Sequence, residues 1–297
     1  MRIAITGSSG LIGTALVRSL GADGHTVVRV VRSGGGADDV RWDIEAGELD
    51  AAGLEGLDGV VHLAGEGIGE KRWTDEQKRK IKESRSKGTR LLAEALAGLS
   101  AKPPVLVSGS AIGIYGDRGD EQLTEASAPG TGFLAEVAKA WEAAAAPAEA
   151  AGIRVAKVRT GIVLDADGGA LQRLATIARF GVLGKIGSGR QWMSWVALAD
   201  EVGAIRFLLD HDVAGPVNVT ASAPVTNEVF TKALGRVLRR PTLLPVPSFG
   251  PKLLLGAELA QSLLYDGQRV LPDVLLEAGY EFEHTDLEPA LRAILSR

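Results

Sequence analysis

Short apolar runs separated by amphipathic or polar stretches fill the first half of the chain. Runs of strand length occupy residues 3–5, 26–31, 40–42, 59–63, 105–107 and 155–159. After the first run, Ile12, Leu16 and Leu20 recur at the spacing of one helix face. The run at 59–63 is almost continuously apolar, which is typical of a strand buried on both faces of a sheet. This alternation predicts an α/β fold with a doubly wound parallel sheet.

Beyond residue 165 the alternation of strands and helices becomes less regular. The pattern there predicts helices over 170–180, 200–209 and 227–238 and a strand over 217–219. A boundary is then marked by Pro241, Pro245, Pro247 and Pro251. We expect a first domain over 1–165, to which residues around 195–222 return. The region 166–297 would be smaller and partly helical, and it would include a C-terminal domain over about 245–297 that covers the substrate side.

A glycine-rich turn, residues 6–13, joins the first predicted strand to the first predicted helix. Gly7 permits a tight turn, Gly10 lets the backbone approach a diphosphate, and Gly13 lets the helix pack on the sheet. The N–H groups at the start of the helix would face the anion. The chain has 38 glycines, so the triplet alone is a weak signal. Its position inside a βαβ unit predicts a dinucleotide-binding site.

Arg32 and Ser33 follow the second predicted strand, and Arg32 lies nineteen residues after Gly13. A binding unit for NAD usually places Asp or Glu here, on the ribose 2′-hydroxyl. A carboxylate would repel a 2′-phosphate, whereas a planar guanidinium can bind phosphate oxygens with two hydrogen bonds. Arg32 with Ser33 therefore favours NADP over NAD. The alternative is a solvated arginine at the end of a strand.

Composition narrows the classes of partner. The chain has 297 residues and 45% hydrophobic content, enough for a large core in one α/β domain or in two closely joined ones. With a net charge of −4, the chain has no excess of positive charge that would attract nucleic acid or an anionic membrane. The absence of cysteine excludes disulfides, thiol catalysis and thiolate metal ligands, and the four histidines are too scattered to resemble a metal motif.

Targeting signals are also missing from the sequence pattern. The first strand begins at residue 2 with no secretory segment before it, and no apolar run approaches the length of a membrane span. We therefore expect a cytoplasmic protein with a small-molecule substrate and with neither a nucleic-acid nor a membrane partner.

Further candidate binding residues follow the third and fourth apolar runs. Asp43 could hydrogen-bond an adenine edge, although a turn aspartate explains it equally well. Small residues around Glu66, namely Ala64, Gly65 and Gly67, would let the backbone pass close to a cofactor.

A basic stretch, residues 71–90, has helical character. We interpret it as a solvated helix face or a subunit contact rather than as an anion-binding surface, with Arg72 and Arg85 as the side chains of most interest. A subunit contact would be compatible with a homodimer.

Hydroxyl groups gather after the run at 105–107. Ser108, Ser110 and Tyr115 lie in the segment SGSAIGIYG, and ligands of open parallel sheets bind at the carboxyl ends of the strands. These hydroxyls would lie over the reactive end of the cofactor. A helix predicted from residue 133 carries Lys139 nearby.

These motifs together resemble the extended short-chain dehydrogenase/reductases, the NAD(P)-dependent epimerase/dehydratase group. The resemblance rests on the glycine triplet, HLAG at 62–65, SGSAIGIYG at 108–116 and Lys139. An atypical branch, the uncharacterised epimerase family proteins of the SulA type, is similar in HLAGEGIGEKRW, FLAEVAKAWE, RTGIVLDADGGAL and GSGRQWMSWV. The last segment is similar to the short C-terminal domain of unknown function of that branch. The resemblance covers the chain nearly end to end.

The resemblance implies a Rossmann-type core that binds NADP(H) at the glycine turn, with a substrate cleft between the core and the C-terminal part. It places the catalytic hydroxyl on Ser110 and the lysine of the Tyr-x-x-x-Lys pair on Lys139, where the lysine would hold the nicotinamide ribose. The tyrosine position of that pair is Ala135, so the usual general acid/base is missing. Tyr115 is the nearest replacement phenol, although we favour its packing as a structural aromatic.

The substrate side departs from the family pattern. Arg85 stands in place of the asparagine of the Asn-x-x-Gly-Thr pattern, and Met193 in place of an arginine that grips the substrate diphosphate in sugar-nucleotide epimerases. Arg190 is a candidate substitute for that arginine. Trp192 and Trp195 suggest an apolar or aromatic wall, so a nucleotide-sugar substrate is doubtful.

Two functions remain open at this point. The first is an NADP-dependent oxidoreductase or epimerase-like enzyme that transfers a hydride to or from a small carbonyl or alcohol. The second is a catalytically degenerate NADPH-binding regulatory or interaction protein. The predicted catalytic residues are Ser110, Tyr115 and Lys139. The predicted cofactor-binding residues are Thr6, Gly7, Ser9, Gly10, Leu11, Ile12, Gly13, Arg32, Ser33, Asp43, Leu63, Ala64, Gly65, Glu66, Ser108 and Lys139.

Overall fold

The computed structural model describes residues 1–36, 38–179, 183–242 and 249–296. In these ranges one eight-stranded sheet has the order β12-β8-β6-β5-β1-β2-β3-β4. Its strands are β1 (Arg2–Thr6), β2 (Thr26–Val31), β3 (Val40–Asp43), β4 (Glu48–Leu49), β5 (Gly59–His62), β6 (Val105–Ala111), β8 (Arg154–Thr160) and β12 (Gly215–Val219). Neighbouring strands are parallel except β3 and β4. The predicted α/β fold with a doubly wound parallel sheet is confirmed.

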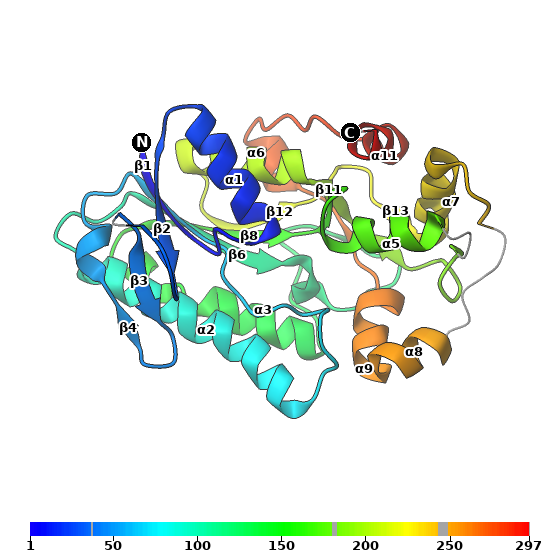
Figure 1. Ribbon diagram of the computed structural model, residues 1–297, viewed down its shortest axis with the longest axis horizontal. Coiled ribbons are helices and arrows are strands. Elements are labelled where there is room, and N and C mark those ends of the chain that lie inside the picture. The colour runs from blue at the N-terminus through cyan, green and yellow to red at the C-terminus, as the bar shows by residue number, and fades with distance from the viewer. Residues whose placement is uncertain (37, 180–182, 243–248, 297) are drawn as a thin grey trace.

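Helices cover both faces of the sheet (Figure 1). On one face lie α1 (Leu11–Ala22) and α6 (Leu198–Asp210). On the other lie α2 (Asp75–Gly98), α3 (Phe133–Ala143) and α4 (Ala146–Ala150). Short 3₁₀ turns, η1 (Ala51–Leu54) and η2 (Ile112–Tyr115), follow β4 and β6. All parallel strands end at the same edge of the sheet, where the predicted site residues follow them.

Each face of the sheet has its own hydrophobic core because side chains alternate along a strand. Ile5 on β1 packs with Leu16 and Leu20 of α1, whereas its neighbour Ala4 packs toward Leu92 of α2. All five side chains are buried, and burying a leucine contributes roughly 1.5–3 kcal/mol. The two cores hold the glycine turn between β1 and α1 in place.

A smaller layer lies beside the carboxyl edge of the sheet. It contains β9 (Ile162–Leu164), α5 (Gly169–Arg179), β10 (Trp192–Met193), β11 (Trp195–Ala197), β13 (Val225–Thr226), α7 (Asn227–Leu238) and α11 (Leu287–Leu295). Trp195, Phe230 and Leu291 pack in its core. Residues 198–219 return to the large sheet as α6 and β12.

The C-terminal segment begins with α8 (Phe249–Leu255), α9 (Ala257–Ala260) and the π-helical turn η3 (Gln261–Tyr265). It continues with β14 (Arg269–Val270), which pairs with β7 (Gln122–Leu123), and with α10 (Asp273–Glu277). The predicted boundary at about residue 245, with Pro245 and Pro247, lies outside the described residues, as does residue 180 of the predicted helix 170–180.

Two boundaries differ by four residues from the sequence-based expectation. The basic helix α2 begins at Asp75, not at residue 71, because the hydroxyl of Thr74 accepts a hydrogen bond from the Gln77 N–H at 3.1 Å and caps the helix. The strand expected at 105–107 extends to Ala111 as β6. Within the described ranges, none of the helices has the length and apolar character needed to cross a membrane.

Candidate functional site

The glycine turn between β1 and α1 has no room for side chains at two of its three glycines. Gly7 has a φ of +66°, and a Cβ there would lie 2.8 Å from the Leu63 carbonyl carbon. A Cβ at Gly13 would lie 2.1 Å from the Gly7 oxygen. Gly10 caps α1 without a side-chain hydrogen bond, and the first turn of the helix carries no acidic residue. The turn therefore leaves the N-terminal N–H groups of α1 open to an anion.

Neighbours of the turn have separate roles. Ser9 is exposed, whereas Ile12 packs against the core that contains Leu16 and Leu20 of α1. The Leu11 side chain lies 2.7 Å from where a Cβ on Gly168 would be. Leu11 thus brings the glycine turn against the turn between β9 and α5.

Arg32 and Ser33 lie at the carboxyl end of β2, beside the glycine turn. The parallel register places Val30 of β2 opposite Thr6, so Arg32 follows where β1 turns into the glycine loop. Arg32 is exposed and makes no hydrogen bond or ion pair with any other described residue. Its charge helps to lower the pKa of Glu66, after the larger effect of the Gln77 hydrogen bond. An unpaired guanidinium is thus available at this end of the turn.

Thr6 faces the interior of the protein. Its hydroxyl contacts the His62 ring at 2.7 Å and accepts hydrogen bonds from the Leu63 and Ala64 N–H groups at 3.1 and 3.2 Å. Burial, and secondarily the charge of Arg85, lowers the pKa of His62 to about 4, so this ring is neutral. The Thr6 side chain therefore joins β1 to β5, and only its backbone remains available for its predicted cofactor role.

Asp43 is used in a turn. Its Oδ1 accepts hydrogen bonds from the Glu45 and Ala46 N–H groups at 2.9 and 3.0 Å. This geometry supports the turn-aspartate alternative over an adenine contact.

Arg85 lies beneath the loop that follows β5. Its Nη1 donates to the Glu66 carbonyl at 2.8 Å, and its guanidinium lies 4.9 Å from the centre of the Trp141 ring. A Cβ on Gly65 would lie 3.0 Å from the guanidinium carbon, so this glycine permits the approach. Burial lowers the pKa of Arg85 to about 10, which leaves it charged at neutral pH. Arg85 thus supports the backbone at Gly65 and Glu66.

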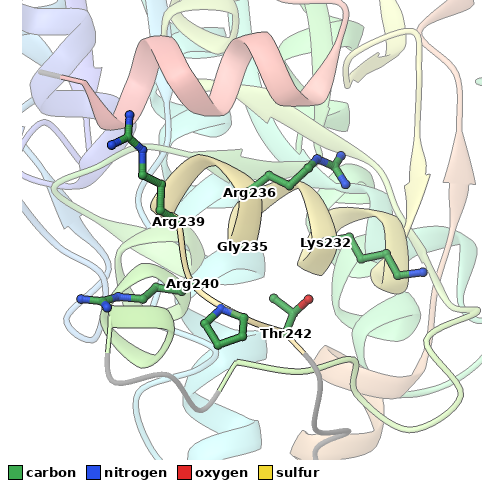
Figure 2. Close-up of a pocket in the computed structure, with 7 residues that line it drawn as sticks. Lys232, Gly235, Arg236, Arg239, Arg240 and Thr242 are labelled. Carbon is green, nitrogen blue, oxygen red and sulfur yellow. The ribbon is translucent and has the colours of Figure 1, made fainter.

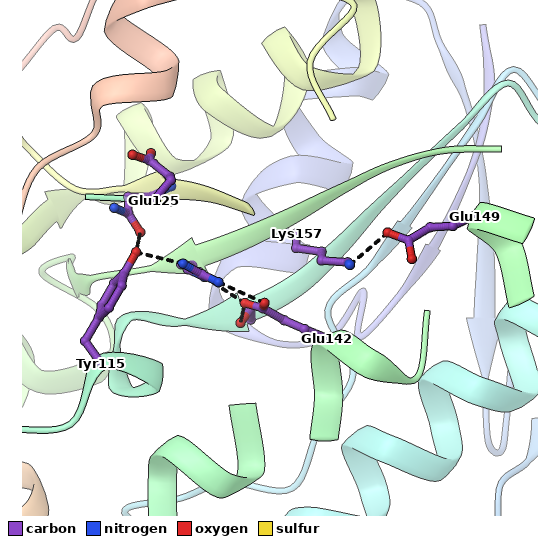
Figure 3. Close-up of polar contacts among 8 residues, drawn as sticks. Tyr115, Glu125, Glu142, Glu149 and Lys157 are labelled. Carbon is purple, nitrogen blue, oxygen red and sulfur yellow. Dashed lines mark hydrogen bonds and ion pairs between the residues drawn. The ribbon is translucent and has the colours of Figure 1, made fainter. Parts of the chain in front are cut away.

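Ser110 belongs to a buried polar network, of which Figure 3 labels Tyr115 and Glu142. Parallel register places Ser110 opposite Arg159, and Arg159 opposite Asn218, in one row across β6, β8 and β12. The Ser110 hydroxyl donates to Glu142 Oε1 of α3 at 2.7 Å. Arg159 donates to both carboxylate oxygens of Glu142, at 2.8 and 3.0 Å. The single proton of Ser110 is therefore committed to Glu142.

Tyr115 closes the far end of this network. Its hydroxyl donates to Asn218 Oδ1 at 2.7 Å and accepts from Arg159 Nη1 at 2.9 Å. The side chain is 0% exposed, and burial raises the pKa of its phenol. This geometry supports the structural role that we favoured for Tyr115 over proton transfer with a substrate.

Other predicted site residues lie around Ser110. Lys139 on α3 is half-exposed and forms an ion pair with Glu136, and Ala135 at the tyrosine position is 1% exposed. Ser108 is fully buried, and its Oγ has no hydrogen-bond partner among the described residues. A buried hydroxyl of this kind is not placed to contact a ligand directly in this arrangement.

The glycine turn, the exposed Arg32 and the hydroxyl-bearing end of β6 all lie at the carboxyl edge of the sheet. The model of the NAD-dependent epimerase/dehydratase family matches residues 3–220. The chain belongs to this family. A second model, of a domain of unknown function, matches residues 246–294.

Relatives within the epimerase family are similar over their whole length. An epimerase family protein of Mycobacterium leprae (strain TN) is 41% identical over 297 residues, covering 99% of this chain and 96% of the relative. Epimerase family protein SDR39U1 of Homo sapiens is 34% identical over 301 residues, covering 100% of both.

Solved structures of epimerase family members share the fold. The crystal structure of human SDR39U1 (isoform 2) with NADPH has a TM-score of 0.91 and 31% identity, covering 100% of this chain and 99% of the human chain. A nucleoside-diphosphate sugar epimerase from Corynebacterium glutamicum has a TM-score of 0.82 and 38% identity, covering 99% of this chain and 58% of that chain.

The expected aromatic wall of this epimerase family member is only partly present. Trp195 is fully buried and donates to the Ala223 carbonyl at 3.2 Å, so it cannot line a cleft, which corrects the prediction. Trp192 is half-buried, donates to Asp120 Oδ1 at 2.8 Å and stacks under Arg269. Arg190 lies 3.8 Å from Asp120 and is 82% exposed.

A cavity of about 330 Å³ lies elsewhere, at the end of α7. Its lining contains Lys232, Arg236, Arg239 and Arg240. Figure 2 shows their charged ends pointing in different directions, and Lys232 and Arg236 already pair with Glu228 and Glu288. This cavity therefore offers no convergent anion site. In the described part of the chain, no group of three acidic or histidine side chains could hold a metal ion.

Glu142, Arg159 and Asn218 are the site residues that sequence reasoning missed. A signal for one of them was present, because Arg159 directly follows the apolar Val158 near the end of a predicted strand and occupies a buried position of that strand. Charged side chains in such strands require a buried partner. The identity of that partner follows only from the packing of α3 on the sheet.

Proposed function

We propose that this protein binds NADP(H) across the glycine turn and acts as an NADP-dependent oxidoreductase or epimerase-like enzyme on a small alcohol or carbonyl compound. The observation that carries the proposal is Arg32, an unpaired exposed guanidinium at the carboxyl end of β2 beside the turn. Guanidinium groups bind phosphate oxygens bidentately, so Arg32 with Ser33 suits the 2′-phosphate of NADP.

The residues present fit this cofactor. Gly7 and Gly13 form a turn that only glycine can occupy, and the start of α1 supplies unpaired N–H groups for the diphosphate. Gly65 and Glu66 follow β5, the strand next to β1, and would border the cofactor there. The human relative SDR39U1, whose crystal structure contains NADPH, supports the same assignment for this chain. When bound, NADP(H) would supply or accept the hydride.

Ser110 is the residue that we expect to contact the reacting oxygen of the substrate. Since its proton is donated to Glu142, its oxygen is left to accept a hydrogen bond. A substrate alcohol can donate to it, and the proton of Ser110 can then pass to the Glu142 carboxylate. Arg159 holds that carboxylate with two hydrogen bonds and thereby fixes the Ser110 hydroxyl. Lys139 would hold the ribose of the nicotinamide.

Activity is tested by following reduced nicotinamide absorbance with a panel of alcohols and NADP⁺, and with carbonyls and NADPH. We expect Ser110→Ala to lower kcat by about 100-fold or more, since proton transfer typically contributes 10²–10⁴-fold. NADPH affinity should remain within about twofold of wild type, since no cofactor contact is assigned to this hydroxyl. Unchanged turnover in Ser110→Ala would contradict this assignment.

A second candidate function is a catalytically degenerate NADPH-binding regulatory or interaction protein. It is favoured by Ala135 at the tyrosine position and by the burial of Tyr115, which together leave no phenol beside Ser110 among the described residues. Tight NADPH binding with no turnover of any alcohol or carbonyl in the panel would favour this function over the enzyme.

A further inference from the structure

The segment 66–74 has no α-helix or β-strand and leads from the loop after β5 to α2. Its first residue is fixed to α2, because the Glu66 N–H donates to Ser84 Oγ at 3.0 Å and Arg85 donates to the Glu66 carbonyl. Gly65 and Glu66 are predicted cofactor neighbours. Residues 66–74 therefore begin at the predicted border of the cofactor and lead from there to α2.

Arg72 connects this segment to the end of α8. Its Nε donates to the Leu254 carbonyl at 3.1 Å, and its Nη2 donates to the Leu253 carbonyl. Carbonyl groups in the last turn of a helix lack intrahelical partners, and a cation is favourable at this negative end. The contact joins residues 182 positions apart in the sequence.

Lys78, on the first turns of α2, makes a second connection. Its Nζ donates to both carboxylate oxygens of Glu258 on α9, at 3.2 and 3.0 Å. The same ammonium group lies 5.6 Å from the centre of the Phe133 ring, which packs edge-on against Trp73. Lys78 therefore contacts α9 on one side and the aromatic pair at the end of segment 66–74 on the other.

Gly69, in the middle of the segment, is held from two sides. Arg173 of α5 donates to its carbonyl at 3.2 Å. The Leu263 side chain of η3 lies 3.5 Å from where a Cβ on Gly69 would be. Segment 66–74 is thus contacted by α5, α8 and η3.

The C-terminal segment has its own anchors on the rest of the fold. Gln191 donates to the Leu264 carbonyl at 2.7 Å, and Ser194 donates to the Gln268 carbonyl at 2.7 Å. The Val270 N–H donates to Ser194 Oγ at 2.8 Å, and β14 pairs with β7. Figure 1 shows α8 and α9 next to the loop that leads into α2. Residues 249–265 therefore bridge the anchored β14 and the segment 66–74.

We propose that residues 249–265, in the stretch matched by the domain of unknown function, hold segment 66–74 over bound NADP(H). The contacts between residues 249–265 and segment 66–74 then set the rate at which NADP(H) dissociates. The inference rests on the proposed binding of NADP(H). In this proposal segment 66–74 moves when the cofactor leaves, and its movement breaks the contacts that Arg72 and Lys78 make with residues 249–265. Arg72 and Lys78 are positioning residues and not catalytic ones.

Stopped-flow fluorescence of NADPH displaced from the full-length protein measures the dissociation rate. We expect Arg72→Ala to release NADPH about 3–10-fold faster, because two hydrogen bonds from a charged donor are lost. Lys78→Glu should also accelerate release, because it faces Glu258 with a like charge. The double variant Lys78→Glu/Glu258→Lys should restore the rate to within about twofold of wild type, since it re-forms the pair in reverse.

Arg90→Ala is the matched control, because Arg90 lies on the same helix and forms its ion pair with Glu94 of that helix. Thermal unfolding of each apo-protein separates a general loss of stability from a change in release. The inference is overturned if Arg72→Ala and Lys78→Glu bind NADPH and release it at the wild-type rate, a result that leaves the proposed function intact. Failure of the wild-type protein to bind NADPH would overturn the proposed function as well.

Discussion

Single residues decide the geometry of the glycine turn, and Gly13 is the clearest case. A Cβ at this position would lie 2.1 Å from the Gly7 oxygen, a distance that the backbone must relieve by moving. We expect Gly13→Ala to lower the free energy of unfolding by about 1–3 kcal/mol, the range for overpacked positions. It should also abolish measurable NADPH binding.

Gly21→Ala is a control on the same helix, because no described atom other than the local backbone of α1 lies within 4 Å of a Cβ there. That variant should be stabilised by about 0.5–1 kcal/mol, since alanine is the better helix former. Urea unfolding of both variants provides the comparison. Equal stabilities of Gly13→Ala and wild type would contradict the described turn.

Residue roles at the site were predictable only where the backbone determines them. The spacing of Gly7 and Gly13 follows from local geometry, so sequence alone predicts it. The hydrogen-bond partner of the Tyr115 hydroxyl is Asn218, which lies 103 residues away in the sequence. The Trp195 side chain donates to the Ala223 carbonyl in a separate core. Such partners are set by tertiary packing, which the local pattern of polar and apolar residues does not encode.

At the scale of elements, the first turn of α6 contains a buried acid. Glu201 is 0% exposed and accepts a hydrogen bond from the Thr160 hydroxyl at 2.7 Å. Burial raises the pKa of Glu201 from 4.5 to about 8, while the Thr160 hydrogen bond opposes the shift. The folded protein therefore carries this side chain protonated at neutral pH, whereas the unfolded chain carries it ionised.

The stability linked to Glu201 has a defined pH window. Because the folded pKa is the higher one, this stability is complete below about pH 4.5 and is lost as the pH rises through about 8. We expect Glu201→Gln to remove about 2 kcal/mol or more of pH dependence between those limits, measured by urea unfolding at several pH values. The pKa of His62 is lowered on folding, so the pH dependence of stability linked to His62 has the opposite sign. The stability linked to His62 is complete above about pH 6.5 and is lost as the pH falls through about 4.

Glu94→Gln provides the control for this experiment, because Glu94 is 56% exposed on α2 and, within the described part of the chain, forms its ion pair with Arg90. The control should keep the pH profile of the wild type. A wild-type profile in Glu201→Gln would show that Glu201 is ionised in the folded protein.

Elements were predicted well where the apolar period is long and regular. The helix expected at 227–238 is α7, with the same limits, because Thr226 caps its start and its apolar face packs on α5 and α11. The start of α2 was misplaced by four residues, because a run of basic residues extends through the loop before the Thr74 cap. The basic stretch therefore predicted the presence of α2 but not the residue at which it begins.

The whole molecule combines a sheet with two helical faces, a smaller layer and a C-terminal segment that contacts the loop after β5. The parallel arrangement of the central strands followed from the alternation of strands and helices, since parallel strands need crossover connections. Their order in the sheet came only from the structure. The contact of Arg72 with α8 did not follow, because α8 and the loop approach each other only in the folded molecule.

The central claim is that NADP(H) lies across the glycine turn with its 2′-phosphate on Arg32. Calorimetric titration of the apo-protein with NADPH and NADH tests it most directly, with Arg32→Asp compared against Arg29→Asp, an exposed arginine in the middle of β2. We expect wild type and Arg29→Asp to prefer NADPH. Arg32→Asp should weaken NADPH binding about 10–100-fold and NADH binding far less, because a charge-assisted phosphate contact is replaced by repulsion. No heat with either coenzyme, or equal losses for both in Arg32→Asp, would contradict the account.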